Sequence, residues 1–191
     1  MQLIFATNNQ NKVKEIASVL PTTIEVKSLK EAAIIIDIAE PHDTLKENAS
    51  EKSRTIFNLT HQNCFSEDSG LEVDALGGAP GVKSARYAGE AANDEKNIEK
   101  LLSELSGKTD RSARFRTIIS LIWNEMEYWF EGVCEGEIID EKLGENGFGY
   151  DPIFIPNGNN KTFAQMNLDE KNLFSHRKKA MSQLIAFLKN S

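Results

Sequence analysis

The sequence has little cysteine, no long apolar run and no excess of positive charge. Its two cysteines, Cys64 and Cys134, form no CxxC or Cys/His spacing, which argues against a zinc site and against a disulfide framework. The apolar stretch at residues 32–39 is interrupted by Asp37 and is far too short to span a bilayer. A formal net charge of -7 argues against a broad surface for nucleic acid or anionic membranes, because clustered Lys and Arg bind such partners. We therefore expect a cytoplasmic protein with reduced thiols and with neither a membrane nor a nucleic-acid polymer as its partner.

The composition that remains is ordinary for a soluble globular protein, with 40% hydrophobic and 27% charged residues among 191. Because no repeat, low-complexity tract or linker interrupts the chain, we expect one domain over residues 1–191. Apolar runs rich in β-branched residues alternate with apolar residues at helical spacing, which predicts a mixed α/β fold with a twisted sheet and flanking helices. We expect strands near residues 3–6, 25–29, 63–73, 113–123, 127–139 and 153–155, and helices at 12–20, 45–59, 94–107 and from Ser175 onward.

Local signals mark several of these boundaries. Thr44 and Glu47 have the spacing of a capping box, and we expect Asp94 to cap the following helix. Ser69 and Gly70 are expected to break the extended segment at residues 63–73. The last helix should face a core with its apolar positions Ala180, Leu184, Phe187 and Leu188.

A polar loop separates the first predicted strand from the first predicted helix. It offers backbone N–H groups at a helix N-terminus, small polar side chains and one cation, which suits the binding of a phosphate group. It lacks the glycines of a Walker A loop, and taken alone a plain helix cap is the commoner explanation of such residues. The loop consists of Thr7, Asn8, Asn9, Gln10, Asn11 and Lys12.

Two acidic residues, Glu67 and Asp68, stand next to each other at the end of an apolar segment. Adjacent carboxylates repel, so we interpret the pair as a site rather than as a stabilising feature, and hard oxygen ligands of this kind suit Mg²⁺. On the preceding helix, Thr44, Asn48 and Lys52 recur every four residues and therefore share one face. That face either directs an amide and an ammonium group to one place or is simply solvated.

Two further groups carry polar chemistry near the C-terminus. Residues 148–151 follow a glycine that permits close backbone approach, and their aromatic rings could stack on a base or fill a core. Cations surround the start of the last helix, where they oppose the helix dipole, and this misfit favours a functional role. The residues are Phe148, Gly149, Tyr150 and Asp151 in the loop, and Lys171, His176 and Arg177 at the helix.

Taken together, five motifs resemble the inosine triphosphate pyrophosphatase family in order and spacing over nearly the whole chain. They are ATNNQNKVKEI at 6–16, Glu40 with TLKENA at 44–49, SEDSGLEVDALGGAPGVKSARYAGE at 66–90, GFGYDPIFIP at 147–156 and EKNLFSHRKKA at 170–180. The resemblance implies an elongated α/β fold with two lobes around a central cleft, usually as a homodimer. The sequence departs from the family pattern at Glu67, where many members carry Asp, and at Pro41-His42-Asp43.

By the same resemblance, residues Thr7 to Lys12 bind the triphosphate with help from Lys52. Glu40 and Asp68 hold the magnesium ion, and Asp68 is also the general base. Ser69 contacts the substrate, and Phe148 to Asp151 hold the base and the ribose. Lys171, His176 and Arg177 read the purine edge. The departure at Glu67 leaves open whether this residue also binds metal.

The implied activity is hydrolysis of deaminated purine nucleoside triphosphates, ITP, dITP and XTP, to the monophosphate and pyrophosphate. One alternative is a nucleotide pyrophosphatase of the Maf type, although its Ser-x-x-Arg-Arg style opening is absent here. A second alternative is a nucleotide-binding regulator that has lost catalysis.

Overall fold

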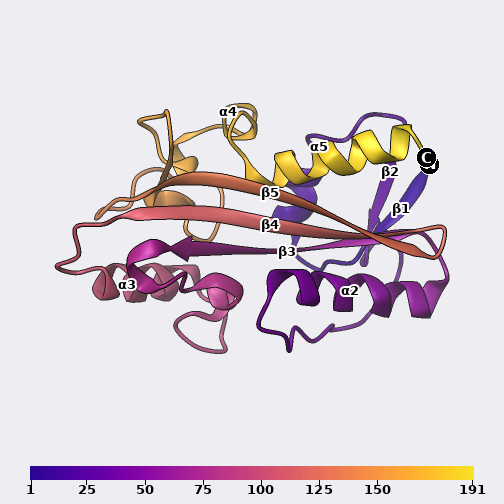
Figure 1. The fold of residues 1–191 in the computed structure, drawn as a ribbon, viewed down its shortest axis with the longest axis horizontal. Coiled ribbons are helices and arrows are strands. Elements are labelled where there is room, and N and C mark those ends of the chain that lie inside the picture. The colour runs from indigo at the N-terminus through magenta and orange to yellow at the C-terminus, as the bar shows by residue number, and fades with distance from the viewer. The chain divides into compact units, whose positions relative to one another are not determined.

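A computed structural model describes all residues from 1 to 191 as one six-stranded sheet with helices (Figure 1). The strand order is β2-β1-β3-β4-β5-β6. The strands are β1 (Gln2–Phe5), β2 (Glu25–Ser28), β3 (Cys64–Val73), β4 (Ser112–Trp123), β5 (Met126–Ile138) and β6 (Phe154–Pro156). The α-helices are α1 (Gln10–Ala17), α2 (Leu45–Thr60), α3 (Asp94–Glu104), α4 (Leu168–Asn172) and α5 (His176–Lys189).

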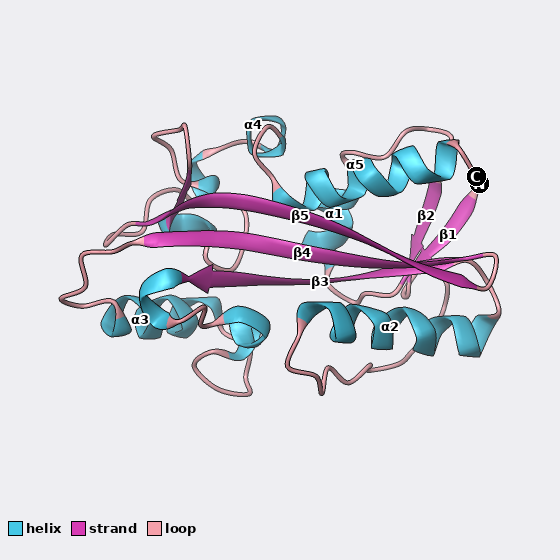
Figure 2. Cartoon of the chain, viewed as in Figure 1, coloured by secondary structure: helices cyan, strands magenta, loops and turns pink.

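The sheet is mixed in its strand directions. β1 pairs in parallel with both β2 and β3 (Figure 2). β5 and β6 are antiparallel. β4 and β5 are joined by Asn124 and Glu125 alone, which have φ values of 49° and 65°. Positive φ at both central residues is typical of the two-residue turns whose twist matches a hairpin. The predicted class, a mixed α/β sheet with flanking helices, is confirmed.

The chain contains two compact units. The first comprises residues 1–68, 117–132 and 177–191, and the second comprises residues 69–116 and 133–176. All three strands β3, β4 and β5 contain a boundary between the units, so each unit includes a part of every one of them.

In the first unit, strand side chains that point alternately to the two faces of the sheet form two apolar cores. Leu3 and Phe5 of β1 pack in a cluster with Leu184 of α5, whereas Ile4 packs in a separate cluster with Ile56 of α2. Successive strand residues point to opposite faces, so a continuously apolar strand can serve both helices. α2 and α5 accordingly lie on opposite sides of the strands in this unit (Figure 1).

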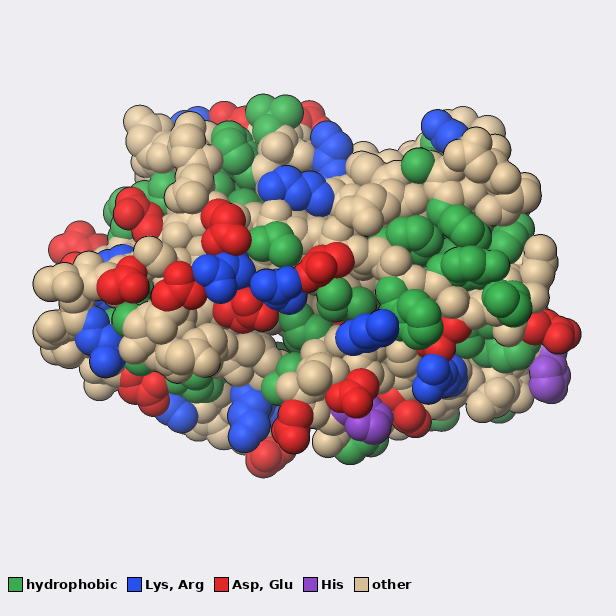
Figure 3. Space-filling view, viewed as in Figure 1, with side chains coloured by type: hydrophobic (Ala, Val, Ile, Leu, Met, Phe, Trp, Pro, Cys, Tyr) green, Lys and Arg blue, Asp and Glu red, His purple; other side chains and the backbone are tan.

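The helix α5 covers its side of the first unit with apolar residues. Ala180, Leu184 and Leu188 are buried, as their spacing predicts, whereas Phe187 is half-buried. The centroid of the Phe187 ring lies 4.3 Å from the ring centroid of Tyr128 and 5.7 Å from that of Phe130, both on β5. Hydrophobic side chains are gathered alongside α5 in the space-filling view (Figure 3).

The second unit has an aromatic core of its own. Phe115 of β4, Phe154 of β6 and Phe163 form a cluster in which the Phe115 centroid lies 4.7 Å from Phe154 and 5.9 Å from Phe163. Ile98 and Leu101 of α3 belong to the same buried cluster. Aromatic rings bury a large apolar area and make favourable edge contacts with one another, so apolar packing stabilises this unit.

Several predicted boundaries need correction. β3 runs unbroken from Cys64 to Val73, so Ser69 and Gly70 do not break the extended segment as predicted. A Cβ at Gly70 would lie 2.3 Å from the carbonyl oxygen of Gly81. Glycine therefore permits a close approach at this position and does not end the strand. α3 is capped by Asn93, whose side chain accepts a hydrogen bond from the Lys96 N–H, so Asp94 is the first helical residue. The short helix α4 was not predicted.

Both cysteines are buried free thiols, as the sequence predicts. None of the helices combines the length and the apolar character that a membrane crossing requires.

Candidate active site

The neighbouring carboxylates Glu67 and Asp68 point to opposite faces of β3. Phe65 and Glu67 face the side of α1 and α5, where Glu67 meets Arg177, while Cys64 and Asp68 face α2. The repulsion that we inferred from their adjacency is therefore much reduced, because strand alternation separates their side chains. Each carboxylate instead belongs to its own ionic group, and both groups lie in the first unit.

Asp68 shares the ammonium group of Lys52 with Glu40. The Lys52 Nζ lies 3.0 Å from the Asp68 Oδ1 and donates a second, short hydrogen bond to Glu40. Lys52 and Asp68 are buried, whereas the Glu40 side chain is 34% exposed. The structure thus brings together Glu40 and Asp68, which the resemblance assigns to the metal, and Lys52, which it assigns to the triphosphate.

Burial and charge oppose each other in this group. Burial raises the pKa of Asp68 above its ordinary value; the positive charges of Lys52 and Lys12 oppose this, and the negative charge of Glu40 adds to it. Burial alone would lower the pKa of Lys52, but the charges of Asp68 and Glu40 raise it. Two carboxylates and one ammonium group carry one net negative charge here, which favours the binding of a further cation.

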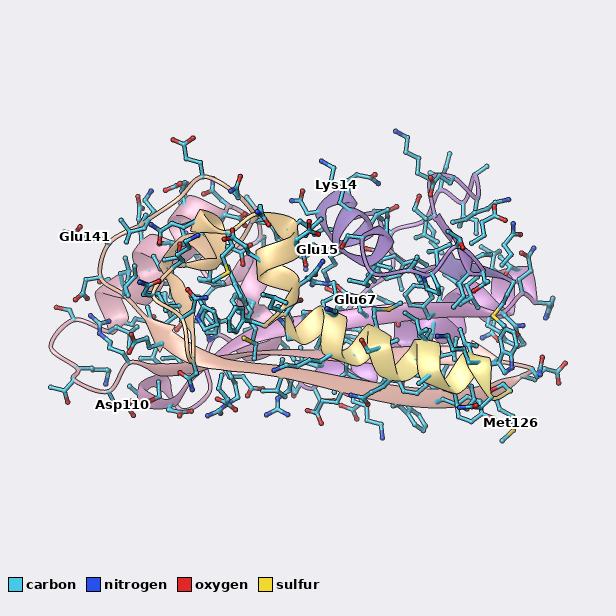
Figure 4. All side chains as sticks on the ribbon, turned by 90° about the horizontal axis from the view of Figure 1, so that it is seen from above. Lys14, Glu15, Glu67, Asp110, Met126 and Glu141 are labelled. Atoms are coloured by element: carbon cyan, nitrogen blue, oxygen red, sulfur yellow. The ribbon has the colours of Figure 1, made fainter.

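Glu67 is the centre of the second ionic group. Its Oε2 accepts a hydrogen bond from the Arg177 Nε at 2.7 Å, and its Oε1 lies 3.2 Å from the Lys12 Nζ. Arg177 also pairs with Glu15 of α1. The Glu15 side chain lies near Glu67 and the start of α5 (Figure 4). Burial works to raise the pKa of Glu67, but Arg177 and Lys12 hold it at about 2.

The polar loop at residues 7–12 is partly helical. Asn9 caps α1 by accepting hydrogen bonds from the N–H groups of Asn11 and Lys12, so Gln10, Asn11 and Lys12 form the first helical turn. The helix therefore begins earlier than predicted and ends at Ala17 rather than near residue 20. Thr7 accepts a hydrogen bond from the Asn9 N–H, and Asn8 donates one to the carbonyl of Ile36 at 3.0 Å.

The loop at residues 148–151, in the second unit, is held in place by the buried ion pair of Asp151 and Lys171. The Asp151 Oδ2 accepts hydrogen bonds from the Lys171 Nζ at 2.6 Å and from the Phe148 N–H at 3.0 Å. The Lys171 ammonium group also lies 5.4 Å from the Phe148 ring centroid, within the range of a cation–π contact. The Tyr150 hydroxyl donates to the carbonyl of Ser84 at 2.9 Å.

Three further residues of the predicted site, His176, Gly149 and Ser69, lie in the second unit. His176 is 3% exposed and stacks on Phe115 with ring centroids 4.9 Å apart. Gly149 donates its N–H to the Asp94 carboxylate at 2.7 Å. Ser69 continues β3 and is half-buried.

Three residues hold these groups in place in a way that the sequence did not predict: Glu15, Asn48 and Asp94, of which Asp94 was expected only to cap a helix. Asn48 had been noted only as part of a polar helix face, and its buried amide bonds the backbone of His42 at both N–H and carbonyl. Nothing local distinguishes Glu15 from the other acidic residues of a helix, because its partner Arg177 lies 162 residues away.

Residues 3–187 match the Ham1 family. This chain belongs to the Ham1 family. The resemblance inferred from the five sequence motifs is confirmed.

Among its Ham1-family relatives, the dITP/XTP pyrophosphatase of Christiangramia forsetii is 51% identical over 98% of this chain and 99% of its own length. That of Flavobacterium psychrophilum is 49% identical over the full length of both chains. The Staphylococcus aureus Ham1 protein is 43% identical and superposes with a TM-score of 0.90, covering 100% of this chain and 99% of its own. A Ham1 protein from Coxiella burnetii, 38% identical, superposes with a TM-score of 0.91 over all of both chains. Membership of the Ham1 family leaves the Maf-type alternative without support.

The donors of this Ham1-family chain fit a magnesium ion. Glu40 and Asp68 offer hard carboxylate oxygens around one point, and they retain a net negative charge after Lys52 is counted. No group of three or more His, Cys, Asp or Glu side chains is arranged to hold a metal. Mg²⁺ suits a site with only the two carboxylates of Glu40 and Asp68, because it commonly takes one or two protein carboxylates together with phosphate oxygens and water. Glu67 is already paired with Arg177 and Lys12, so Glu40 and Asp68 are the better candidates.

Proposed function

We propose that this chain hydrolyses the deaminated purine nucleoside triphosphates dITP, XTP and ITP to the monophosphate and pyrophosphate. The observation that carries the proposal is the buried Asp68 carboxylate in the middle of β3, which shares Lys52 with Glu40. Relatives 51% and 49% identical over nearly the whole chain are named dITP/XTP pyrophosphatases. Removal of deaminated purines from the nucleotide pool is the biological role that follows.

In the proposed reaction, a water molecule attacks the α-phosphorus and the bond to the pyrophosphate oxygen breaks. Asp68 orients this water and accepts its proton, acting as a general base. Lys12 and Lys52 neutralise negative charge on the phosphate oxygens, and both cations already lie beside carboxylates that they can exchange for phosphate. The electron pair of the broken bond leaves with pyrophosphate.

Glu40 and Asp68 would hold the magnesium ion. When bound, such an ion polarises phosphate oxygens and stabilises the charge of the leaving group. Before the nucleotide binds, Lys52 bonds both carboxylates, and Asn48 bonds the backbone of His42, two residues after Glu40.

Phe148 would be available for stacking on the base, and Lys171, His176 and Arg177 would be donors toward a six-oxo group. Adenine presents an amino group at that position, so a buried donor would lose its acceptor. A site built around such a bond rejects the analogue that lacks it by factors of roughly 10⁴ to 10⁵.

The decisive experiment measures pyrophosphate release from dITP, XTP, dATP and dGTP with Mg²⁺, using the wild type, Asp68→Asn and Asp110→Asn. We expect rapid release from dITP and XTP only, and a loss of about 10² to 10⁴-fold in Asp68→Asn, because the general base is removed. Asp110 is an exposed carboxylate and serves as the matched control.

A wild type that binds dITP without cleaving any triphosphate would contradict the proposal in favour of a nucleotide-binding regulator. Equal cleavage of dATP and dITP would contradict the proposed selectivity. Circular dichroism of the three proteins separates a catalytic loss from unfolding.

The proposal includes a cytoplasmic homodimer, as the family resemblance implies. Light scattering on the purified chain tests the assembly: a mass of twice 21.3 kDa is expected, and a mass of 21.3 kDa would contradict it.

A further inference from the structure

Glu40 lies on a segment that has no regular hydrogen-bond ladder to hold it. Residues 34–44 form neither helix nor strand and connect the turn after β2 to α2. Ile34, Ile36 and Ile38 anchor the first part by packing against the cluster that contains Ile56. Ala39, Glu40 and Pro41 are exposed, so apolar packing does not continue to Glu40 itself.

The amide of Asn48 supplies the missing restraint. Its Oδ1 accepts a hydrogen bond from the His42 N–H at 2.9 Å, and its Nδ2 donates to the His42 carbonyl at 3.0 Å. Asn48 is only 2% exposed, and both of its polar ends bind the same residue of the segment. A side chain held at both ends and buried in this way fixes the backbone of His42 relative to α2.

The geometry of α2 connects this restraint to Glu40. Lys52 lies one turn beyond Asn48 on the same helix, and its ammonium group bonds the Glu40 side chain. Asn48 thus holds the backbone two residues after Glu40 while Lys52 holds the carboxylate. Lys52 and Glu51 also contact this part of the segment from α2, but they do so through the side chains of Glu40 and His42, whereas Asn48 bonds the backbone.

We infer that Asn48 is a positioning residue that keeps Glu40 in place as a metal ligand beside Asp68. This inference rests on the proposed function, because it assumes that Glu40 and Asp68 hold the divalent cation. Residues that orient metal ligands typically change metal affinity by 10–100-fold when they are replaced.

The chain offers a matched control at Asn97 of α3. Asn97 is also 2% exposed, accepts from the Ala88 N–H at 2.8 Å and donates to the Ala85 carbonyl at 3.0 Å. It therefore restrains another loop by the same pair of bonds, in the second unit rather than the first. Asn97→Ala should destabilise the protein much as Asn48→Ala does, without moving Glu40.

The experiment titrates wild type, Asn48→Ala, Asn48→Asp and Asn97→Ala with Mn²⁺ and follows free Mn²⁺ by electron paramagnetic resonance. We expect at least a tenfold weaker affinity in Asn48→Ala and an affinity within about twofold of wild type in Asn97→Ala. Asn48→Asp keeps the size and the acceptor but loses the donor, so it should also weaken Mn²⁺ binding and serves if Asn48→Ala does not fold. The Mg²⁺ concentration for half-maximal dITP cleavage should rise in parallel, with kcat at saturating Mg²⁺ largely retained.

Equal Mn²⁺ affinity in a folded Asn48 variant and in Asn97→Ala would overturn the inference, and so would a wild type that binds no Mn²⁺. A wild type that binds Mn²⁺ but releases no pyrophosphate would instead contradict the proposed function alone. The two failures are therefore distinguishable.

Discussion

At the scale of single residues, the thiol of Cys64 links stability to alkaline pH. Cys64 is completely buried, and burial raises its pKa from 9.0 to about 12. The folded state thus keeps the proton that the unfolded chain loses above pH 9. The contribution of the protonated Cys64 thiol to the free energy of unfolding is fully present below pH 9 and is lost as the pH rises toward about 12. We expect the difference in free energy of unfolding between wild type and Cys64→Ala to shrink over this range, by up to about 1.4 kcal/mol per pH unit.

Urea unfolding at several pH values between 7 and 10.5 measures this difference. Ile122→Val is the control, because it trims a side chain of the same buried cluster without changing a titratable group. Its difference from wild type should stay constant with pH. A constant difference for Cys64→Ala as well would contradict the prediction.

At the scale of elements, Gly70 determines how β3 packs against the turn at residues 81–86. A Cβ at Gly70 would lie 2.3 Å from the Gly81 carbonyl oxygen and 3.3 Å from the Ser84 Oγ, which accepts a hydrogen bond from the Leu71 N–H. Since the obstacle is backbone, it cannot rotate away. We expect Gly70→Ala to lower the free energy of unfolding by about 3 kcal/mol, at the upper end of overpacking effects.

Gly78→Ala gives the comparison, because a Cβ there meets nothing within 4 Å and only the φ of +88° is unfavourable. Its expected cost is about 1 kcal/mol. Denaturant unfolding of both variants distinguishes the two effects, and equal costs would show that the close approach to Gly81 is unimportant.

At the scale of the whole molecule, one arginine joins three distant parts of the chain. Arg177 of α5 binds Glu15 of α1 and Glu67 of β3, and all three side chains are buried. Replacement of Arg177 by Met would leave two buried carboxylates without their main partner. We expect a loss of about 3–5 kcal/mol of stability, as is usual when one member of a buried ion pair is removed.

Arg54→Met is the control for this prediction. Arg54 pairs with Glu127, but its side chain is 57% exposed, so its loss should cost about 0–1 kcal/mol. Adding Glu67→Gln to Arg177→Met should restore part of the stability. A small effect of Arg177→Met alone would indicate that Lys12 and solvent suffice to balance the buried carboxylates.

The sequence alone predicted most of the elements and the family. Hydrophobic periodicity located the strands and the longer helices within a few residues, because it depends on which side chains are apolar along a short stretch. The capping spacing at Thr44 is local in the same sense, and its side chain does cap α2. Motif order along the chain was enough to indicate the resemblance to the inosine triphosphate pyrophosphatase family and, through it, to name Glu40 and Asp68 as metal ligands and Lys52 as a triphosphate-binding residue.

Only the tertiary structure decided which charges meet. Strand alternation sends Glu67 and Asp68 to opposite faces, and the sheet order brings Glu15, Glu67 and Arg177 together although up to 162 residues separate them. The same holds for Asn48, whose role depends on the path of the segment that carries Glu40. Residue types and spacing thus determined which chemistry is available, whereas partners, burial and pKa depend on packing between distant segments, which no local pattern encodes.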